Sequence, residues 1–278
     1  MTSPGILRPP FALIATDLDG TLLRSDGTVG ARTRAALAGA AARGARHVVA
    51  TGRSVAWTRH VLDDLGYTGL AVCGQGGQVY DAAAHRQLAS VTLDRRLARL
   101  AVDRIEAEVG PLLLAADRDG LDGRVVAAPG YRPDPADGLP VVHARHADEV
   151  WAEPVRKFYA QCAGLGEDEL AAAAREAAGH LVGITTAGPG EVEILPAGLS
   201  KATGLSFAAR RLGLRGLDTV AFGDMPNDAP MLEWAGYGVA MADAHPTLKA
   251  VADEVAPGHD EEGVAAVLER LFGLAGPS

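Results

Sequence analysis

The chain has 278 residues, which at roughly 150 residues per domain predicts just under two domains. Hydrophobic residues make up 48% and charged residues 22%, a composition that excludes an intrinsically disordered chain and allows a sizeable core. The 26 basic and 35 acidic residues give a formal charge of −9, which argues against nucleic acids and anionic membranes as partners.

The N-terminal segment and the cysteines predict a cytoplasmic protein. Residues 1–10 contain one arginine and three prolines, and no apolar run precedes Phe11, so we expect neither a signal peptide nor a transit peptide. The longest uncharged stretch, residues 65–80, is rich in glycine and glutamine, which excludes a transmembrane helix. Cys73 and Cys162 are expected to be buried thiols, not a disulfide or a metal site.

Short apolar runs alternate with helix-like segments over the first 80 residues. Residues 11–16 (FALIAT), 47–51 (HVVAT) and 70–73 are predicted to be strands buried on both faces. Residues 32–44 and 54–66 are predicted to be the helices between them. This alternation predicts right-handed βαβ units, and therefore an α/β fold with a doubly wound, Rossmann-like parallel sheet.

The pattern changes after residue 81 and returns after residue 200. Between these points we expect helices at 94–110 and 167–178, strands at 155–163, 181–186 and 191–195, and a loop rich in proline and glycine at 129–140. Beyond residue 200 we expect helices at 200–212 and 227–235 and strands at 219–222 and 238–241. The sequence thus predicts a core of residues 1–83 and 197–278 with an inserted α+β domain, residues 84–196, and hinges near 82–89 and 195–198.

Two acidic residues, Asp17 and Asp19, end the first predicted strand. Open α/β sheets bind their ligands at the carboxyl ends of their strands, so both side chains are expected in a site. Asp17 could attack phosphorus and become an aspartyl phosphate, and Asp19 could protonate the leaving oxygen and later deprotonate water. The competing interpretation is a turn in which aspartate side chains cap the backbone.

Two further motifs supply groups that suit a phosphate. Thr51 and Gly52 follow the second strand, where a hydroxyl and a closely approaching backbone can bind phosphate oxygens, although this pairing is common. Ser200 and Lys201 open the helix after the insertion, and a lysine there opposes the helix dipole unless an anion lies beside it. Because the chain has three lysines, this position is informative; a solvated surface lysine is the alternative.

A fourth motif, Gly223-Asp224-Met225-Pro226-Asn227-Asp228, follows the strand at 219–222. Carboxylates from two strand ends suit Mg²⁺, with water and substrate phosphate completing the octahedron. Asn227 could orient a phosphate or a carboxylate, and it could also cap the following helix. The predicted metal ligands are Asp17, Asp19, Asp224 and Asp228.

In this order, the four motifs resemble those of the haloacid dehalogenase superfamily, in its Cof-type, sugar-phosphatase-like branch. The family's DxDGT corresponds to residues 17–21, its T-G-R to 51–53, its S-K to 200–201 and its G-D-x-x-N-D to 223–228. The resemblance implies a Mg²⁺-dependent phosphotransferase core. It also implies a cap of the IIB-like type, inserted between the second and third motifs, that closes over the core and chooses the substrate.

The sequence departs from the family pattern at two places. Residues 75–77 are Gln-Gly-Gly where the family usually has Asn-Gly-Ala, and residues 242–244 are Ala-Asp-Ala where it has Gly-Asn-Ala. Asp243 is therefore expected to add a negative charge near an anion site. Both departures bear on fine substrate contacts, for which the cap offers Tyr131, Arg132 and Lys157 as candidates.

The sequence thus predicts a Mg²⁺-dependent phosphatase that hydrolyses small phosphomonoesters, such as sugar phosphates or related metabolites, through an aspartyl phosphate on Asp17. We expect no nucleic-acid or membrane partner, and a monomer or homodimer. One alternative is a phosphohexomutase-like phosphotransferase, which returns the phosphoryl group to its substrate. Another is a regulatory phospho-acceptor, which Asp19 and the inserted cap disfavour; a degenerate binding protein is disfavoured by the complete set of motifs.

Overall fold

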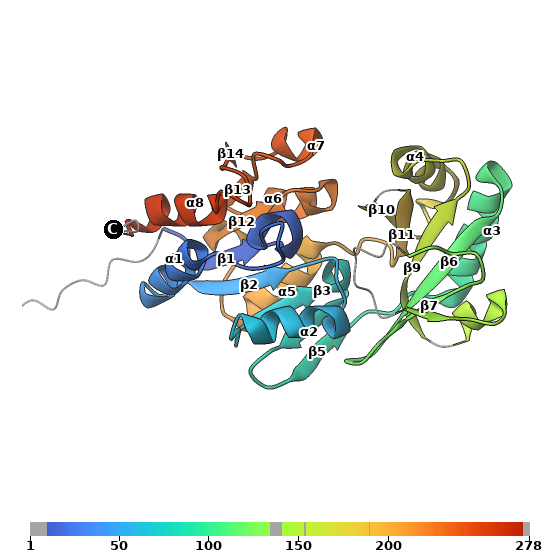
Figure 1. Cartoon of the computed structure of the whole chain (residues 1–278), viewed down its shortest axis with the longest axis horizontal. Coiled ribbons are helices and arrows are strands. Elements are labelled where there is room, and N and C mark those ends of the chain that lie inside the picture. The colour runs from blue at the N-terminus through green and yellow to red at the C-terminus, as the bar shows by residue number, and fades with distance from the viewer. Residues whose placement is uncertain (1–9, 134–140, 153, 189, 275–278) are drawn as a thin grey trace, which may run out of the picture.

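Two β-sheets organise the computed structural model, which describes residues 10–133, 141–152, 154–188 and 190–274 (Figure 1). The larger sheet has eight strands, in the spatial order β14 (Glu254–Val255), β13 (Tyr237–Ala240), β12 (Thr219–Gly223), β1 (Leu13–Thr16), β2 (Arg46–Ala50), β3 (Leu70–Cys73), β4 (Gln78–Asp81) and β5 (Arg86–Ser90). The strands from β14 to β3 are parallel, and β4 and β5 extend the sheet as an antiparallel edge.

Helices cover both faces of the larger sheet because its strands are apolar on both sides. In β2, for example, Val48 and Ala50 belong to one buried cluster and Val49 to another. Residues of α5 pack in the first cluster and residues of α2 in the second. The helices of this part are α1 (Ala31–Ala42), α2 (Val55–Asp64), α5 (Lys201–Arg211), α6 (Ala229–Trp234), α7 (Pro246–Lys249) and α8 (Gly263–Phe272).

The smaller sheet is formed by the segment between β5 and α5. Its six strands lie in the order β10 (Gly183–Gly188), β11 (Glu191–Leu195), β9 (Val155–Cys162), β6 (Leu112–Arg118), β7 (Val125–Ala127) and β8 (Val141–His143). Helices α3 (Arg95–Val109) and α4 (Glu167–Ala178) share one buried cluster with Phe158 and Ile194 on one face of this sheet. The other face is turned toward the larger sheet (Figure 1).

This arrangement confirms the predicted fold class, a doubly wound α/β core with an inserted α+β cap. The exact boundary needs a correction at one end. Strand β5 pairs with β4 and so belongs to the larger sheet. The predicted boundary after residue 83 assigns β5 to the cap, and the predicted hinge at 82–89 overlaps this strand. The hairpin was missed because residues 86–90 carry no alternating apolar pattern. We therefore propose that the cap begins after Ser90.

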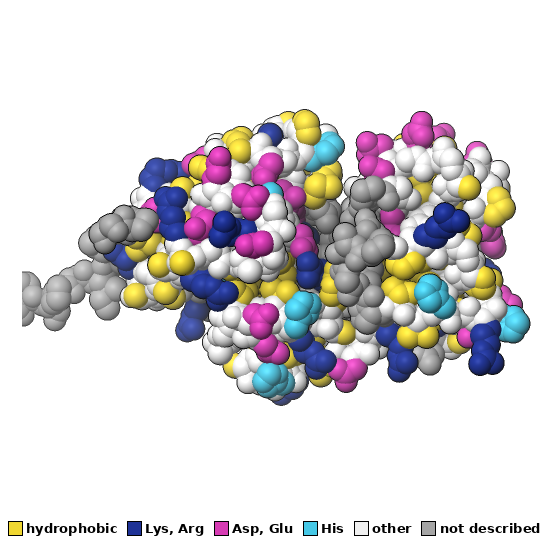
Figure 2. Space-filling model, viewed as in Figure 1, with side chains coloured by type: hydrophobic (Ala, Val, Ile, Leu, Met, Phe, Trp, Pro, Cys, Tyr) yellow, Lys and Arg dark blue, Asp and Glu magenta, His cyan; other side chains and the backbone are white. Residues whose placement is uncertain are grey.

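The cysteines, the helix lengths and the surface charge can be compared with the predictions made from composition. Cys73 and Cys162 are free and buried, as expected. Among the described residues, no helix is both long and apolar enough to cross a bilayer. Figure 2 shows acidic and basic side chains interspersed over the visible face of the core, at left, and of the cap, at right.

A close backbone contact joins α5 to the turn after β3. A Cβ atom on Gly204 would lie 2.8 Å from the Cα atom of Gly76 and would also clash with Val72. Such a distance is shorter than real Cβ contacts, and the atoms it meets are backbone and a buried side chain that have no room to move. Glycine at 204 therefore sets how closely the start of α5 approaches β3.

Gly204→Ala is expected to destabilise the protein by about 2 kcal/mol, because overpacking outweighs the better helix propensity of alanine. The free energy of unfolding from urea titration measures this. Gly166→Ala is the comparison: nothing lies within 4 Å of the added Cβ and the backbone φ is −78°, so only the smaller cost of alanine as the N-cap of α4, below about 1 kcal/mol, is expected. Equal stability of the two variants would contradict the packing argument.

Candidate active site

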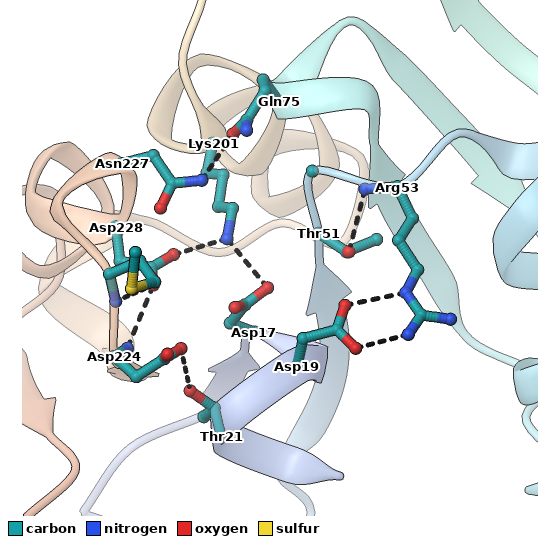
Figure 3. Close-up of polar contacts among 12 residues, drawn as sticks. Asp17, Asp19, Thr21, Thr51, Arg53, Gln75, Lys201, Asp224, Asn227 and Asp228 are labelled. Carbon is teal, nitrogen blue, oxygen red and sulfur yellow. Dashed lines mark hydrogen bonds and ion pairs between the residues drawn. The ribbon is translucent and has the colours of Figure 1, made fainter. Parts of the chain in front are cut away.

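The predicted site residues meet at the carboxyl edge of the larger sheet. Asp17 follows β1, Thr51 follows β2, Asp224 follows β12 and Lys201 opens α5 (Figure 3). They border a cavity of ≈ 330 Å³ that the cap closes from the other side. The cavity is lined by Asp17, Asp19, Gly20, Thr51, Gly52, Arg53, Trp57, Gln75, Lys157, Tyr159, Glu191, Glu193, Lys201, Asp224, Met225 and Asn227.

Lys201 is buried between two carboxylates. Its Nζ lies 2.8 Å from Asp17 Oδ1 and 2.6 Å from Asp228 Oδ1, and only 1% of the side chain is exposed. Burial alone lowers the pKa of a lysine, but Asp17 and Asp228 outweigh burial and raise the pKa of Lys201 above its usual value. Lys201 is therefore a permanent cation, and the alternative of a solvated surface lysine is excluded.

Asp228 anchors the loop after β12. Its Oδ2 accepts hydrogen bonds from the backbone N–H groups of Asp224 and Met225, each at 3.1 Å, while its Oδ1 contacts Lys201. The Asp224 carboxylate accepts a hydrogen bond from Thr21 Oγ1 at 3.0 Å. Gly20 permits that approach, because a Cβ at its φ of +69° would lie within 2.8 Å of Asp224 Cγ.

Three carboxylates crowd together in this site. Single oxygen atoms of Asp17, Asp224 and Asp228 all lie within 4.8 Å of one another. Burial raises the pKa of Asp17 well above its usual range, neighbouring carboxylates add to this, and Lys201 opposes it. Burial and Asp228 likewise raise the pKa of Asp224 to about 7. The crowded oxygen donors, whose negative charge Lys201 balances only in part, fit Mg²⁺.

The Asp19 side chain points away from this acidic group. It forms a two-point ion pair with Arg53, in which Arg53 Nε lies 2.7 Å from Asp19 Oδ2 and Nη2 contacts Oδ1. The Arg53 guanidinium also stacks 4.5 Å from the centre of the Trp57 ring. Asp19 thus lies at the wall of the cavity, half-exposed, and its role as a metal ligand stays a prediction.

The phosphate-binding candidates come from separate segments at the sheet edge, with Thr51 after β2 and Asn227 in the same loop as Asp224. Thr51 is buried, and its Oγ1 accepts a hydrogen bond from the backbone N–H of Arg53 at 3.1 Å. Asn227 Nδ2 donates to Gln75 Oε1 at 3.2 Å, and Asn227 Oδ1 has no partner among the described residues. Gln75, one of the departures from the family pattern, therefore orients Asn227 toward the cavity.

The other departure, Asp243, does not line the cavity. Its carboxylate contacts His259 Nδ1, and His259 Nε2 lies 3.1 Å from Ser25 Oγ. Asp243 therefore contributes no side chain to the cavity lining, and its carboxylate is bound to His259 instead. The sequence could not show this because His259 is 16 residues away and belongs to a loop with no motif of its own.

Of the three cap residues suggested by the sequence, Lys157 lines the cavity. Tyr131 is buried behind the wall, where its hydroxyl donates to Glu191, and Arg132 is exposed outside the cavity lining. Lining residues that the sequence reasoning missed are Trp57, Tyr159, Glu191 and Glu193. The last two alternate with Val192 on a predicted strand, EVEIL, so the acidic face of that strand was the available signal.

Comparison with known proteins agrees with this geometry. The family described as haloacid dehalogenase-like hydrolase matches residues 14–268. The chain is 27% identical to the 5-amino-6-(5-phospho-D-ribitylamino)uracil phosphatase YwtE of Bacillus subtilis, covering 93% of this chain and 97% of the relative. It is 28% identical to the HMP-PP phosphatase of Serratia proteamaculans, with 92% and 93% covered.

Solved structures show the same fold. SMU.1108c from Streptococcus mutans is 24% identical and aligns with a TM-score of 0.81 over 95% of this chain and 99% of that one. BT1666 from Bacteroides thetaiotaomicron, described among phosphatases of the haloalkanoate enzyme superfamily, is 25% identical and aligns with a TM-score of 0.78 over 99% of both chains.

Lys201→Met is expected to lower the free energy of unfolding at pH 7 by about 3 kcal/mol, because it leaves two buried carboxylates without their cation. Urea titration in the absence of divalent ions measures the loss. Lys249→Met is the matched control: Lys249 donates a hydrogen bond to the carbonyl of Ala242 and is not buried, so the expected change is below about 1 kcal/mol. A Lys201 variant as stable as the control would contradict this account of the site.

Proposed function

The chain belongs to the haloacid dehalogenase-like hydrolases and is a phosphoric monoester hydrolase, and from this premise we propose that it is a Mg²⁺-dependent phosphatase acting through an aspartyl phosphate on Asp17. The observation that carries the proposal is the position of Asp17. Its carboxylate lies at the end of a buried strand, contacts the buried Lys201 and borders a cavity closed by the cap.

In the first step, an oxygen of the Asp17 carboxylate attacks phosphorus, and the bond from phosphorus to the leaving oxygen breaks as the new bond forms. Asp19 donates a proton to the leaving oxygen. In the second step, Asp19 takes a proton from water as that water attacks phosphorus. The aspartyl phosphate breaks, so inorganic phosphate leaves and Asp17 is restored.

The surrounding residues prepare the phosphate for this attack. Lys201 lies beside Asp17, where its charge stabilises the negative charge on the phosphoryl oxygens. Thr51, Gly52 and Asn227 also line the cavity and are proposed to hold those oxygens. Arg53 pairs with Asp19, and we expect the incoming phosphate dianion to compete for this guanidinium and release the Asp19 carboxylate for proton transfer.

Asp17 and Asp224 are the residues proposed to hold Mg²⁺. Asp228 supports them, because both of its oxygens already bind Lys201 and the loop backbone. When bound, the ion would neutralise phosphate charge and orient the phosphoryl group. The carboxylates already crowd one another and would repel a phosphate dianion, so binding the dianion needs this additional positive charge.

The substrate is proposed to be a small phosphorylated metabolite. The named relatives are phosphatases of 5-amino-6-(5-phospho-D-ribitylamino)uracil and of HMP-PP. A cavity of ≈ 330 Å³ suits such a molecule. We also propose a cytoplasmic location and a monomer or homodimer.

A phosphohexomutase would convert a hexose phosphate into its isomer, so release of inorganic phosphate without an isomer distinguishes a phosphatase from a mutase. A cap over the site disfavours a regulatory phospho-acceptor, which needs no enclosed pocket for a substrate.

Asp17→Asn is expected to lower the turnover of p-nitrophenyl phosphate at least about 1,000-fold, because the amide cannot form the acyl phosphate. Release of p-nitrophenol in the presence of Mg²⁺ measures turnover, and intact mass after rapid acid quenching detects the phosphorylated protein. The variant should remain folded, since the amide is isosteric and removes one of three crowded carboxylates.

Asp64→Asn is the matched control, because Asp64 is an exposed residue at the end of α2 and lies outside the cavity lining. It should keep wild-type turnover. Substantial phosphatase activity in a folded Asp17→Asn protein would contradict the mechanism.

Removal of divalent ions with EDTA is expected to abolish turnover, and added Mg²⁺ to restore it, because the Asp17–Asp224–Asp228 group has excess negative charge. Isothermal titration of Mg²⁺ into the EDTA-treated protein gives a readout independent of activity. Asp224→Asn should weaken that binding at least about tenfold. Full activity in EDTA would refute the metal requirement.

A further inference from the structure

The cap presents an acidic wall to the cavity. Strands β9 and β11 pair antiparallel with Glu193 opposite Tyr159, so their alternate side chains share one face. On that face Lys157, Tyr159, Glu191 and Glu193 line the cavity across from the core residues. Phe158 belongs to the other face and packs under the cap helices. The wall therefore holds two carboxylates and one ammonium group, and all four side chains are more than nine-tenths buried.

One carboxylate oxygen of Glu193, Oε1, is in an ion pair with Lys157 Nζ, and the other, Oε2, has no hydrogen-bond partner among the described residues. The side chain is 2% exposed, so the second oxygen is also withdrawn from bulk solvent. A buried carboxylate oxygen without a donor is costly, and a ligand that brings a donor removes that cost.

Lys157 fixes the position of this carboxylate relative to the core. Besides its contact with Glu193, Lys157 Nζ donates a hydrogen bond to the carbonyl oxygen of Gly52 at 3.0 Å, and it lies 4.6 Å from the centre of the Tyr159 ring. Gly52 belongs to the loop proposed to bind phosphate. Lys157 therefore holds the Glu193 carboxylate next to the loop that is proposed to bind phosphate.

Glu191 adds to the negative charge of the same wall. Its Oε2 accepts hydrogen bonds from the Tyr131 hydroxyl and, at 3.3 Å, from Gln161 Nε2. Burial first, and then the neighbouring carboxylates Asp117, Glu193 and Glu191, raise the pKa of Tyr159 well above its usual value. The described residues that line this wall thus carry two carboxylates and the ammonium group of Lys157.

We propose that Glu193 determines substrate specificity by accepting a hydrogen bond from the leaving group of the phosphomonoester. The favoured substrate carries a donor there, a hydroxyl or an ammonium group, and a leaving group with its own negative charge is rejected. This inference rests on the proposed phosphatase function and adds to it. A site built to bond a donor discriminates strongly against analogues that lack one, because its buried acceptor is then left unpaired.

The test compares three related phosphomonoesters with wild-type protein and Mg²⁺: glucose 6-phosphate, glucosamine 6-phosphate and 6-phosphogluconate. We expect kcat/KM for 6-phosphogluconate to be about 100-fold below that for glucose 6-phosphate, because its carboxylate meets the acidic wall. Glucosamine 6-phosphate is expected to be hydrolysed at least as efficiently as glucose 6-phosphate, because its ammonium group is a donor that the acidic wall attracts, and a clearly lower kcat/KM for it would contradict the proposal.

Two variants make the test specific to this wall. Glu193→Gln should reduce the discrimination against 6-phosphogluconate at least about tenfold, since the amide is neutral and can donate. Lys157→Met should increase it, because the wall then loses its cation. Glu108→Gln, an exposed glutamate on α3, is the control with the same change of charge and should keep the wild-type ratio.

Equal kcat/KM for glucose 6-phosphate and 6-phosphogluconate in the wild type would overturn the role of Glu193, as would an unchanged ratio in folded Glu193→Gln protein. Circular dichroism and thermal unfolding establish that the variants fold, and if Glu193→Gln does not fold, the wild-type and Lys157→Met ratios decide. If wild-type protein hydrolyses neither the three compounds nor p-nitrophenyl phosphate, the proposed phosphatase function itself fails.

Discussion

The fold brings more carboxylates to one sheet edge than a single cation can balance. Lys201 compensates Asp17 and Asp228, and the three-carboxylate group that includes Asp224 still has excess negative charge. Neighbouring residues hold these groups in place. Asp228 binds both Lys201 and the backbone of the loop after β12, and Gly20 and Gly204 allow close approaches that a side chain would block. The site is therefore suited to a ligand set that includes further positive charge, which a divalent cation supplies.

The sequence predicted the parts of this site that depend on strand ends. Asp17, Thr51 and Asp224 could be assigned because parallel strands place their carboxyl ends at one edge, a rule that needs only the strand pattern. The core–cap organisation followed from where the alternation of strands and helices stops and resumes. Lys201 could be singled out because so few lysines occur in the chain and one begins a helix.

What the sequence could not predict depends on contacts between distant segments. Arg53 pairs with Asp19 across 34 residues, and Lys157 reaches Gly52 across 105, and neither separation follows a period that a pattern could reveal. The β5 strand was missed because an edge strand next to solvent has little apolar content to mark it. Asp243 was placed in the site by its position in a motif, whereas its orientation is set by His259 on another loop.

The core and the cap divide the work of the site between them. The groups that would act on the phosphoryl group all come from the core, where they are held by hydrogen bonds and ion pairs within a few residues of the strand ends. The cap contributes a wall whose charged groups face the cavity, and in the described parts of the chain this wall is bonded to the phosphate loop from Lys157 to the Gly52 carbonyl. Because that bond uses a backbone oxygen, the wall residues can change without altering any side chain in the core. Such a division allows a family of related enzymes to keep one reaction while its members select different leaving groups.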